Sequence, residues 1–359
     1  MLPDFSSVSE ISGNALHEEF MRRCLHLAAL GTGATAPNPM VGAVLVHEGR
    51  ILGEGYHEKF GGPHAEVNCI RSVKEGDQAM IRNSTMYVSL EPCAHHGKTP
   101  PCADLIIQQK IPRVVIGCRD PFPEVDGKGI EKLLSNHVEL IFPVLEEKAI
   151  SLNRRFFTFH QQKRPYIILK WAESANHKIA GSTGERLRIS NEYSNRLVHK
   201  WRAEESGILV GTQTALLDNP LLSARLWPGK NPIRIVLDKD LRLPETLRIF
   251  DGKIPAVILN EKKESRLGNL IYKKIDSGEP LIPAMLSALY SLNILSVLVE
   301  GGAKLLQSFI DSGLWDETRI ITNQELEIPA GLHSPLLKKG PPSKTESYFS
   351  DTIQYHLNR

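Results

Sequence analysis

The chain has 359 residues, with 43 basic and 41 acidic side chains and a net charge of +2. This length exceeds what one hydrophobic core usually organises, so we expect two domains. The balanced charge disfavours a nucleic-acid-binding protein, and no apolar run approaches the roughly 20 residues that a membrane span needs. An odd number of cysteines, five, and an N-terminus without a signal pattern predict a reducing, cytoplasmic location.

The first half of the chain alternates predicted strands and helices. Residues 1–14 are polar and are predicted to form a flexible tail, and a helix follows in which Leu16, Phe20 and Cys24 recur at helical spacing. Further elements are expected at 41–46, 51–56, 64–73, 85–90, 102–109, 114–117, 129–134, 138–141 and 146–159. This alternation predicts a central sheet covered on both faces by helices. The polar segment 161–165 is the best linker, which gives domains of residues 15–162 and 163–359.

The second half begins a new α/β pattern. We expect a helix on which Tyr193, Leu197 and Trp201 share one face, and strands at 166–171, 208–211, 233–237, 257–259 and 297–300. The last strand runs into Gly301-Gly302, and such a turn lets backbone N–H groups approach a phosphate. A tight turn without a ligand is an equally good interpretation. There is no Gly-x-Gly-x-x-Gly motif, so a standard dinucleotide site is not indicated.

His64, Cys93 and Cys102 form the most specific chemical pattern. One imidazole and two thiolates are zinc ligands, and three protein ligands leave the fourth tetrahedral position to water. A bound Zn²⁺ lowers the pKa of that water from about 15.7 to about 7. Glu66 lies two residues beyond His64 and is the expected proton carrier. This is the arrangement of the zinc nucleobase deaminases.

Other interpretations of these residues remain open. A closed structural zinc site would have His95 or His96 as its fourth ligand, but it would leave Glu66 without a role. Cys93 and Cys102 could also be buried apolar side chains. The spacing departs from the general deaminase signature, since eight residues (94–101) separate the two cysteines instead of two.

This long spacer resembles one enzyme family. The segment from Glu91 to Cys102 is similar to the zinc loop of the diaminopyrimidine deaminase of riboflavin biosynthesis, and segments 37–44, 53–57 and 119–121 agree with it. In that family the deaminase is commonly fused to a reductase, and residues 16–325 resemble the bifunctional deaminase–reductase. The resemblance implies an α/β protein with an N-terminal cytidine-deaminase-like three-layer α/β/α domain and a C-terminal dihydrofolate-reductase-like α/β domain.

For the first domain, the resemblance implies hydrolytic deamination with one Zn²⁺ per chain. The substrate would be a small pyrimidine ribonucleotide, 2,5-diamino-6-ribosylamino-4(3H)-pyrimidinone 5′-phosphate, and not a nucleic acid. Glu66 would pass protons to the ring nitrogen and the leaving amine. The positions that match substrate contacts of the family are Asn38, His57, His95, Lys98 and Asp120. For His57 and His95, ordinary loop residues are the alternative.

For the second domain, the resemblance implies NADPH reduction of the ribosyl group to ribityl, giving 5-amino-6-ribitylaminouracil 5′-phosphate. Positions that match cofactor contacts are Ala172, Arg188, Thr214, Asp218, Gly301 and Gly302. Positions that match substrate contacts are Arg186, Arg202, Leu222, Arg225 and Glu300. Arginines suit the ribose phosphate through bidentate pairing, although a solvated surface charge is the alternative for each.

The second domain also departs from the family pattern. The family's Ser-Leu-Asp-Gly is replaced by residues 174–177, Ser-Ala-Asn-His, while Arg186 replaces a serine and Arg188 a tryptophan. A deaminase with a degenerate reductase domain is therefore an alternative. A cytidine, guanine or nucleic-acid deaminase and an inactive zinc-stabilised binding module are others. Relatives suggest a homo-oligomer, a dimer or a tetramer.

Overall fold

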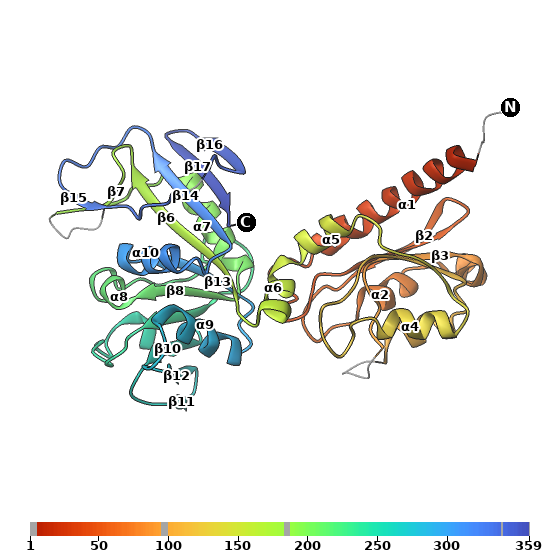
Figure 1. The fold of residues 1–359 in the computed structure, drawn as a ribbon, viewed down its shortest axis with the longest axis horizontal. Coiled ribbons are helices and arrows are strands. Elements are labelled where there is room, and N and C mark those ends of the chain that lie inside the picture. The colour runs from red at the N-terminus through yellow and green to blue at the C-terminus, as the bar shows by residue number, and fades with distance from the viewer. Residues whose placement is uncertain (1–5, 95–99, 183–186, 339, 359) are drawn as a thin grey trace. The chain divides into compact units, whose positions relative to one another are not determined.

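The computed structural model describes residues 6–94, 100–182, 187–338 and 340–358 and divides the chain into two units (Figure 1). Unit 1 spans Met1–Gln161 and unit 2 spans Gln162–Arg359. The division falls at the polar segment that was expected to be the linker. Each unit is organised around its own sheet. None of the helices in the described ranges combines the length and apolarity that a membrane crossing requires.

Unit 1 has a five-stranded sheet in the order β2-β1-β3-β4-β5. The strands are β1 (Gly42–His47), β2 (Arg50–Tyr56), β3 (Thr85–Leu90), β4 (Arg113–Cys118) and β5 (Glu139–Ile141). β1 is antiparallel to β2 and β3, whereas β3, β4 and β5 are parallel to one another. The helices are α1 (Ser6–Ala29), α2 (Ala65–Arg71), α3 (Cys102–Gln108), α4 (Lys128–Ser135), α5 (Glu146–Leu152) and α6 (Arg154–Gln162), with a 3₁₀ helix at Glu75–Asn83.

The period-two alternation of the strands gives this sheet two buried faces. Leu45 and Met86 pack in one core with residues of α2 and α3. Val44, Tyr87 and the α1 residue Met21 pack in a second core on the opposite face. Helices thus cover both faces, which confirms the predicted three-layer α/β/α domain.

The helices of unit 1 differ from the sequence-based expectation at two places. α1 begins at Ser6, inside the segment 1–14 that was expected to be a flexible tail. The single helix expected over 146–159 is divided into α5 and α6 at Asn153. The Asn153 side chain accepts from Met40 N and donates to Met40 O, both at 2.8 Å. This pair of bonds ties the break between the two helices to a distant segment of the chain.

Unit 2 contains a ten-stranded sheet in the order β11-β12-β10-β9-β8-β13-β6-β14-β17-β16. Seven strands from β12 to β14 are parallel, and they are β12 (Leu270–Lys274), β10 (Ala256–Asn260), β9 (Ile233–Leu237), β8 (Gly207–Gly211), β13 (Ser296–Gly301), β6 (Tyr166–Ser174) and β14 (Glu317–Asn323). The antiparallel strands are β11 (Ser265–Leu267), β16 (Lys344–Tyr348) and β17 (Asp351–Leu357), and β7 (Lys178–Gly181) pairs separately with β15 (Gly331–His333).

Helices cover both faces of this sheet as well. They are α7 (Glu192–Glu204), α8 (Thr212–Asp218), α9 (Leu281–Ser291) and α10 (Ala303–Ser312), with a 3₁₀ turn at Arg248–Phe250. Leu209 and Val299 lie in one core with residues of α9 and α10, whereas Leu298 packs on the other face with Trp201 of α7. The carboxyl ends of β6, β8 and β13 are neighbours, and such an edge is where open α/β sheets bind ligands.

Candidate active sites

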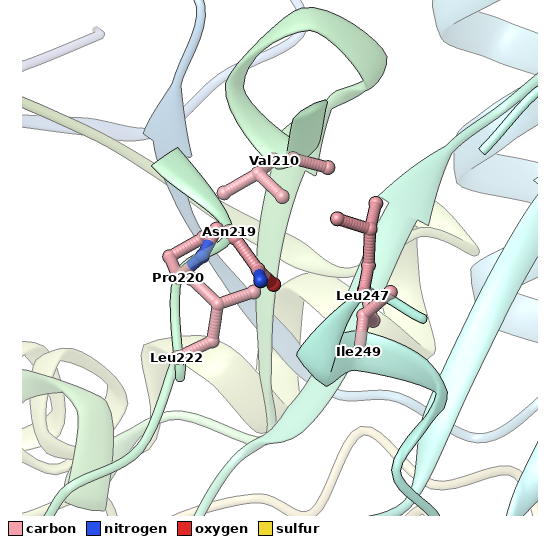
Figure 2. A pocket seen from close by; sticks show the side chains of 7 residues that line it. Val210, Asn219, Pro220, Leu222, Leu247 and Ile249 are labelled. Carbon is pink, nitrogen blue, oxygen red and sulfur yellow. The ribbon is translucent and has the colours of Figure 1, made fainter. Parts of the chain in front are cut away.

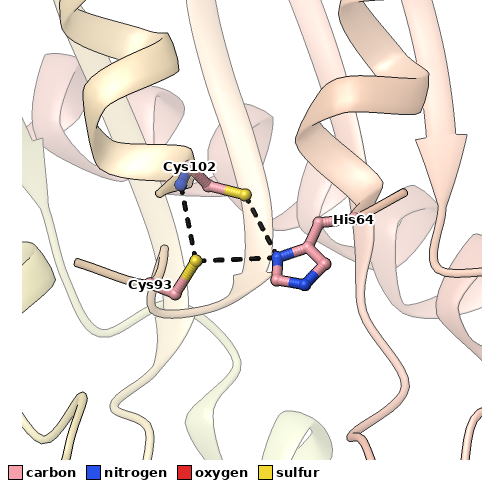
Figure 3. A group of neighbouring side chains, drawn as sticks. All are labelled: His64, Cys93 and Cys102. Atoms are coloured by element: carbon pink, nitrogen blue, oxygen red, sulfur yellow. Dashed lines mark hydrogen bonds between the residues drawn. The ribbon is translucent and has the colours of Figure 1, made fainter. Parts of the chain in front are cut away.

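The three predicted zinc ligands lie together in unit 1 (Figure 3). His64 is the N-cap residue of α2, so that helix begins one residue later than expected. Cys93 follows β3 after a short turn, and Cys102 is the first residue of α3. His64 Nδ1 lies 3.6 Å from Cys93 Sγ and 3.3 Å from Cys102 Sγ. Segments far apart in the chain therefore present three ligand atoms to one point.

These separations fit a zinc ion. Zn–S bonds of about 2.3 Å and Zn–N bonds of about 2.0 Å at a tetrahedral angle put nitrogen and sulfur about 3.5 Å apart. The ligand atoms of His64, Cys93 and Cys102 all lie within 4.8 Å of one another. In the part of the chain that the structure describes, they form the one group of three or more metal-ligand side chains with this property. His95 and His96, the candidate fourth ligands, lie outside the described residues.

The electrostatics of the cluster favour a thiolate. Cys102 N donates to Cys93 Sγ at 3.4 Å, and hydrogen bonding from Cys102 and His64 lowers the pKa of the Cys93 thiol. Glu66 is in the first turn of α2 and is buried, with 3% of its surface exposed. Burial, followed by the charge of Cys93, raises the pKa of the Glu66 carboxyl. A buried acid beside the ligands is suited to holding and releasing a proton.

Asn38 and His57 are brought to the same site. His57 Nδ1 lies 2.9 Å from Pro63 O, and Asn38 Nδ2 lies 3.2 Å from His57 Nε2. A neutral ring that donates from Nδ1 and accepts at Nε2 satisfies both contacts. Desolvation lowers the pKa of His57, which favours this neutral form. The ring centroids of His57 and His64 are 5.6 Å apart, so His57 connects Asn38 to the ligand segment.

Asp120 is buried in the loop after β4, where its Oδ1 accepts from Phe122 N at 2.8 Å. Burial raises the pKa of Asp120 to about 7. Sequence reasoning missed the neighbouring Glu91, whose buried carboxylate accepts from Asp120 N at 3.3 Å. A carboxylate directly before Pro92-Cys93, at the end of an apolar strand, was the available signal. His95 and Lys98, also predicted to contact substrate, lie outside the described residues.

In unit 2, three predicted cofactor residues meet at the carboxyl ends of β8 and β13. Gly301 ends β13, Gly302 precedes α10 with φ +84°, and Thr214 lies in the first turn of α8. A Cβ on Gly301 would lie 2.8 Å from Thr214 Cγ2, and one on Gly302 would lie 3.4 Å from Thr214 Oγ1. Thr214 fills the space beside Gly301, so glycine there allows the end of β13 and α8 to pack closely. The backbone N–H groups at the start of α10 suit a cofactor phosphate, so the turn fits a dinucleotide.

Two predicted substrate residues of unit 2 bind each other. Arg202 Nε and Nη2 each donate to a Glu300 oxygen at 2.7 Å, and Arg202 Nη1 donates to Ser223 O at 3.1 Å. Both side chains are largely buried, with 14% and 7% exposed. A solvated surface charge is therefore the wrong interpretation for Arg202, whereas Arg225 is exposed.

Leu222 lies on the wall of a small apolar pocket (Figure 2). It is buried and has φ +50°, a backbone conformation that leucine rarely adopts. The other lining residues are Val210, Ala215, Asn219, Pro220, Leu247 and Ile249. This pocket lies beside α8, the helix that carries Thr214.

The remaining predicted residues of unit 2 are more dispersed. Ala172 is half-buried on β6, and Asp218 is exposed at the end of α8. Arg188 is exposed and makes a 3.5 Å contact with Glu192. Arg186 lies outside the described residues. Arg188 thus lies in the segment before α7, and its partner among the described residues, Glu192, is exposed as well.

Lys170 and His199 are titratable residues that were not among the site residues predicted from the sequence. Burial lowers the pKa of Lys170, and the charge of Glu300 acts against this shift. His199 is buried, and burial followed by the charges of Arg202 and Arg225 lowers its pKa to about 4. Both residues interact electrostatically with the Arg202–Glu300 pair, which the sequence around them did not signal.

The turn at residues 174–177, which departs from the family pattern, keeps a backbone conformation that glycine commonly adopts. His177 has φ +57°, in the left-handed region that glycine adopts readily. Its Nδ1 lies 2.8 Å from Glu173 Oε1, and Glu173 also accepts from Trp171 Nε1 at 2.8 Å. Asn176 Nδ2 donates to Ile328 O at 3.0 Å. The turn is therefore held by contacts of its own, and the substitutions do not disrupt it.

Two family models match the chain. Residues 14–118 match the cytidine and deoxycytidylate deaminase zinc-binding region, and residues 165–323 match the RibD C-terminal domain. The first match contains all three zinc ligands and Glu66. The second contains Thr214, Gly301 and the Arg202–Glu300 pair.

Relatives match over both units. The riboflavin biosynthesis protein RibD of Aquifex aeolicus is 40% identical over 307 residues, covering 84% of this chain and 85% of that protein. The RibD of Escherichia coli is 35% identical and covers 84% and 85%. A solved structure from Thermotoga maritima, described as a diaminohydroxyphosphoribosylaminopyrimidine deaminase/5-amino-6-(5-phosphoribosylamino)uracil reductase, is 37% identical with a TM-score of 0.84, covering 96% of this chain and 99% of that one. With this similarity across the zinc site and the second unit alike, the chain belongs to the RibD family of riboflavin biosynthesis proteins.

Proposed function

We propose that residues 15–162 deaminate 2,5-diamino-6-ribosylamino-4(3H)-pyrimidinone 5′-phosphate and that residues 163–359 reduce the product with NADPH. The observation that carries the first step is the convergence of His64, Cys93 and Cys102, with the buried Glu66 beside them. The observation that carries the second is the Gly301-Gly302 turn, which packs against Thr214 and leads into the N-terminus of α10. Both steps match the activities named for the Thermotoga maritima relative.

In the deaminase site, His64, Cys93 and Cys102 would hold Zn²⁺. When bound, the ion supplies a Lewis acid that makes water nucleophilic near neutral pH. Water adds to the ring carbon that bears the 2-amino group, and the C–N bond to that group then breaks. Glu66 takes the proton of the water and delivers protons to the ring nitrogen and the departing ammonia. Its burial keeps this proton transfer away from bulk solvent.

The other deaminase residues position the substrate. Asn38 is held by His57, which leaves its amide oxygen available to the pyrimidine. Asp120 lies in the loop after β4, and its raised pKa would allow it to donate a hydrogen bond to the substrate near neutral pH. His95 and Lys98 complete the proposed set, with the Lys98 ammonium suited to the phosphate.

In the reductase site, the cofactor supplies the hydride that converts the opened ribosyl group to ribityl. The protein's part is to orient the two molecules. Thr214, Gly301 and Gly302 would contact NADPH, together with Ala172, Arg188 and Asp218. Leu222, Arg225, the Arg202–Glu300 pair and Arg186 would contact the substrate. Because Glu300 neutralises Arg202, we assign the phosphate chiefly to Arg225.

A deaminase with a degenerate reductase domain is not favoured. The family match covers residues 165–323, and the departing turn at 174–177 retains an ordered backbone. The test is purified protein given the diaminopyrimidine nucleotide with and without NADPH, followed by mass spectrometry. We expect ammonia release in both samples and a gain of two hydrogens only with NADPH. Ammonia release without that gain would support the degenerate alternative.

We further propose that the protein acts in the cytoplasm. All five cysteines are free, and Cys24, Cys69 and Cys118 are buried thiols of the kind that a reducing compartment preserves. Fractionation of the native host tests this location. A homo-oligomeric state, a dimer or a tetramer, stays a prediction, and sedimentation analysis of the purified chain measures it.

A further inference from the structure

Glu91 has an unusual set of partners for a buried carboxylate. Its side chain accepts from four backbone N–H groups on a distant segment. Oε2 accepts from Asp120 N at 3.3 Å and from Gly127 N at 3.1 Å. Oε1 accepts from Gly129 N at 2.9 Å and from Ile130 N at 3.2 Å. Only 4% of the residue is exposed.

This carboxylate supplies the N-terminal cap of α4. The N-cap position is Gly127, which has φ +86° and no side chain with which to cap the helix. Gly129 and Ile130 are the second and third residues of α4, and their N–H groups are those that a capping side chain normally satisfies. Negative charge is stabilised at this end of a helix. Glu91 thus caps the N-terminus of α4 from another part of the chain, because Gly127 has no side chain that could do so.

The backbone is packed closely around this contact. A Cβ on Gly129 would lie 1.9 Å from Pro92 O and 3.2 Å from Glu91 Oε1. Glu91 N also donates to Cys118 O at 3.0 Å, at the end of β4. The start of α4 therefore rests directly on Pro92, the residue that precedes the ligand Cys93.

We propose that Glu91 is a positioning residue of the deaminase site, which fixes Asp120 and the Cys93 segment relative to each other through backbone hydrogen bonds. This inference rests on the proposed deaminase function. Glu91 touches neither substrate nor metal in this account. Its effect is exerted on one residue that contacts the pyrimidine and on one that holds the ion.

The isosteric change Glu91→Gln tests the proposal. Because each oxygen accepts two N–H bonds, an amide NH₂ in either orientation faces two N–H donors and loses both bonds. Removing a supporting interaction of this kind typically costs 10- to 100-fold in activity or metal affinity. We expect the kcat/KM of ammonia release to fall by roughly that factor, with KM raised several-fold because Asp120 is displaced.

The KM distinguishes a positioning role of Glu91 from an effect on the fraction of folded molecules. A preparation with fewer folded molecules has a lower kcat and an unchanged KM, whereas misplaced substrate contacts change KM in every molecule. Zinc per chain and NADPH oxidation with the deaminated substrate are measured on the same sample. The reductase unit serves as an internal control and should keep its wild-type rate. Glu139→Gln, on the exposed end strand β5 of the same unit, is the matched control and should leave all values unchanged.

A second variant perturbs the contact while leaving Glu91 intact. Gly129→Ala forces the added Cβ against Pro92 O, and we expect the same rise in KM. In the double variant Glu91→Gln/Asp120→Asn, the two effects should be less than additive, since one residue acts through the other.

Each outcome has a distinct meaning. Wild-type kcat and KM in Glu91→Gln would overturn the proposal, as would a fall in kcat with an unchanged KM. Failure of both Glu91→Gln and Gly129→Ala to give a folded unit 1 would make Glu91 a stability residue and also overturn it. If the wild-type protein releases no ammonia from the diaminopyrimidine nucleotide, the proposed function fails first.

Discussion

Arg202 of α7 and Glu300 of β13 form a bidentate ion pair in which both nitrogen–oxygen distances are 2.7 Å. Burial by itself would raise the pKa of Glu300, but the charge of Arg202 and its hydrogen bonds outweigh this, and the pKa is lowered. The pair joins a helix to the end of a central strand, beside the Gly301-Gly302 turn. Two residues that the sequence assigned separately to the substrate thus act as one structural unit.

Breaking this pair should destabilise unit 2. Arg202→Met leaves the Glu300 carboxylate buried without its partner, and such a loss costs about 3–5 kcal/mol. Urea unfolding in the absence of NADPH measures it. Arg242→Met removes an exposed pair with Asp240 at 3.5 Å and should cost less than about 1 kcal/mol. Equal effects of the two substitutions would contradict the structural importance of the Arg202–Glu300 pair.

Gly301→Ala should weaken NADPH binding. Its Cβ would lie 2.8 Å from Thr214 Cγ2, so that the turn or α8 must move. We expect the Kd for NADPH to rise at least about tenfold, which corresponds to about 1.4 kcal/mol. Fluorescence titration with NADPH measures the Kd without any turnover.

The same clash provides a rescue and a control. Thr214→Ser removes Cγ2, so the double variant Gly301→Ala/Thr214→Ser should recover part of the lost affinity. Gly211→Ala, at the end of β8, meets nothing closer than 3.8 Å and should bind NADPH normally. If Gly211→Ala is as damaging as Gly301→Ala, close approach at Gly301 is not the reason.

His199 should make the stability of unit 2 depend on pH. Its pKa is about 4 in the folded chain and about 6.5 when unfolded, so the unfolded state binds more protons between these values. The free energy of unfolding should therefore rise as the pH increases from 4 to 6.5, and this contribution should be constant above that range. The full shift corresponds to roughly 3 kcal/mol.

The variant His199→Gln isolates this contribution. Urea unfolding at pH 5 and pH 7 should show a smaller difference for the variant than for the wild type. His333→Gln, at a site on β15 that is exposed to solvent, should keep the wild-type difference. An unchanged pH dependence in His199→Gln would show that another group is responsible.

Asn153→Ala should destabilise unit 1 by about 1–2 kcal/mol, because it removes both hydrogen bonds to the half-buried backbone of Met40. Thermal unfolding followed by circular dichroism measures this change. Asn136→Ala, at the exposed end of α4, is the comparison and should have a much smaller effect. Similar melting temperatures for Asn153→Ala and wild type would contradict a stabilising role of the Asn153–Met40 hydrogen bonds.

The zinc ligands and the strand–helix order could be predicted because their signals are local. His64-Ala65-Glu66 and Pro92-Cys93 are short patterns in which ligand type and neighbouring apolar runs agree. The cofactor turn at Gly301-Gly302 was similarly visible at the end of an apolar strand. These features depend on residues close together in the sequence.

The features that could not be predicted depend on contacts between residues that are far apart in the sequence. Glu91 caps a helix that begins at Lys128, and Asn153, at the break between α5 and α6, binds Met40. The elements at 212–218, 265–274, 281–291 and 317–357 were also missed. The strands β11, β16 and β17 pair antiparallel at or near the sheet edges, and the interior strand β14 carries buried polar residues such as Glu317 and Arg319, so their hydrophobic pattern is incomplete. Arg202 could not be distinguished from a surface charge until Glu300 was placed beside it.

The most direct test of the whole account is Glu66→Gln assayed for zinc content and for ammonia release from the diaminopyrimidine nucleotide. Because Glu66 is not a ligand in this account, the variant should retain one zinc per chain. Its ammonia release should fall by at least about 100-fold, since it lacks the group that carries protons. NADPH oxidation with the deaminated substrate should continue at the wild-type rate. A variant that releases ammonia normally, or one that loses its zinc, would contradict the assignment of a three-ligand site with an unligated acid beside it.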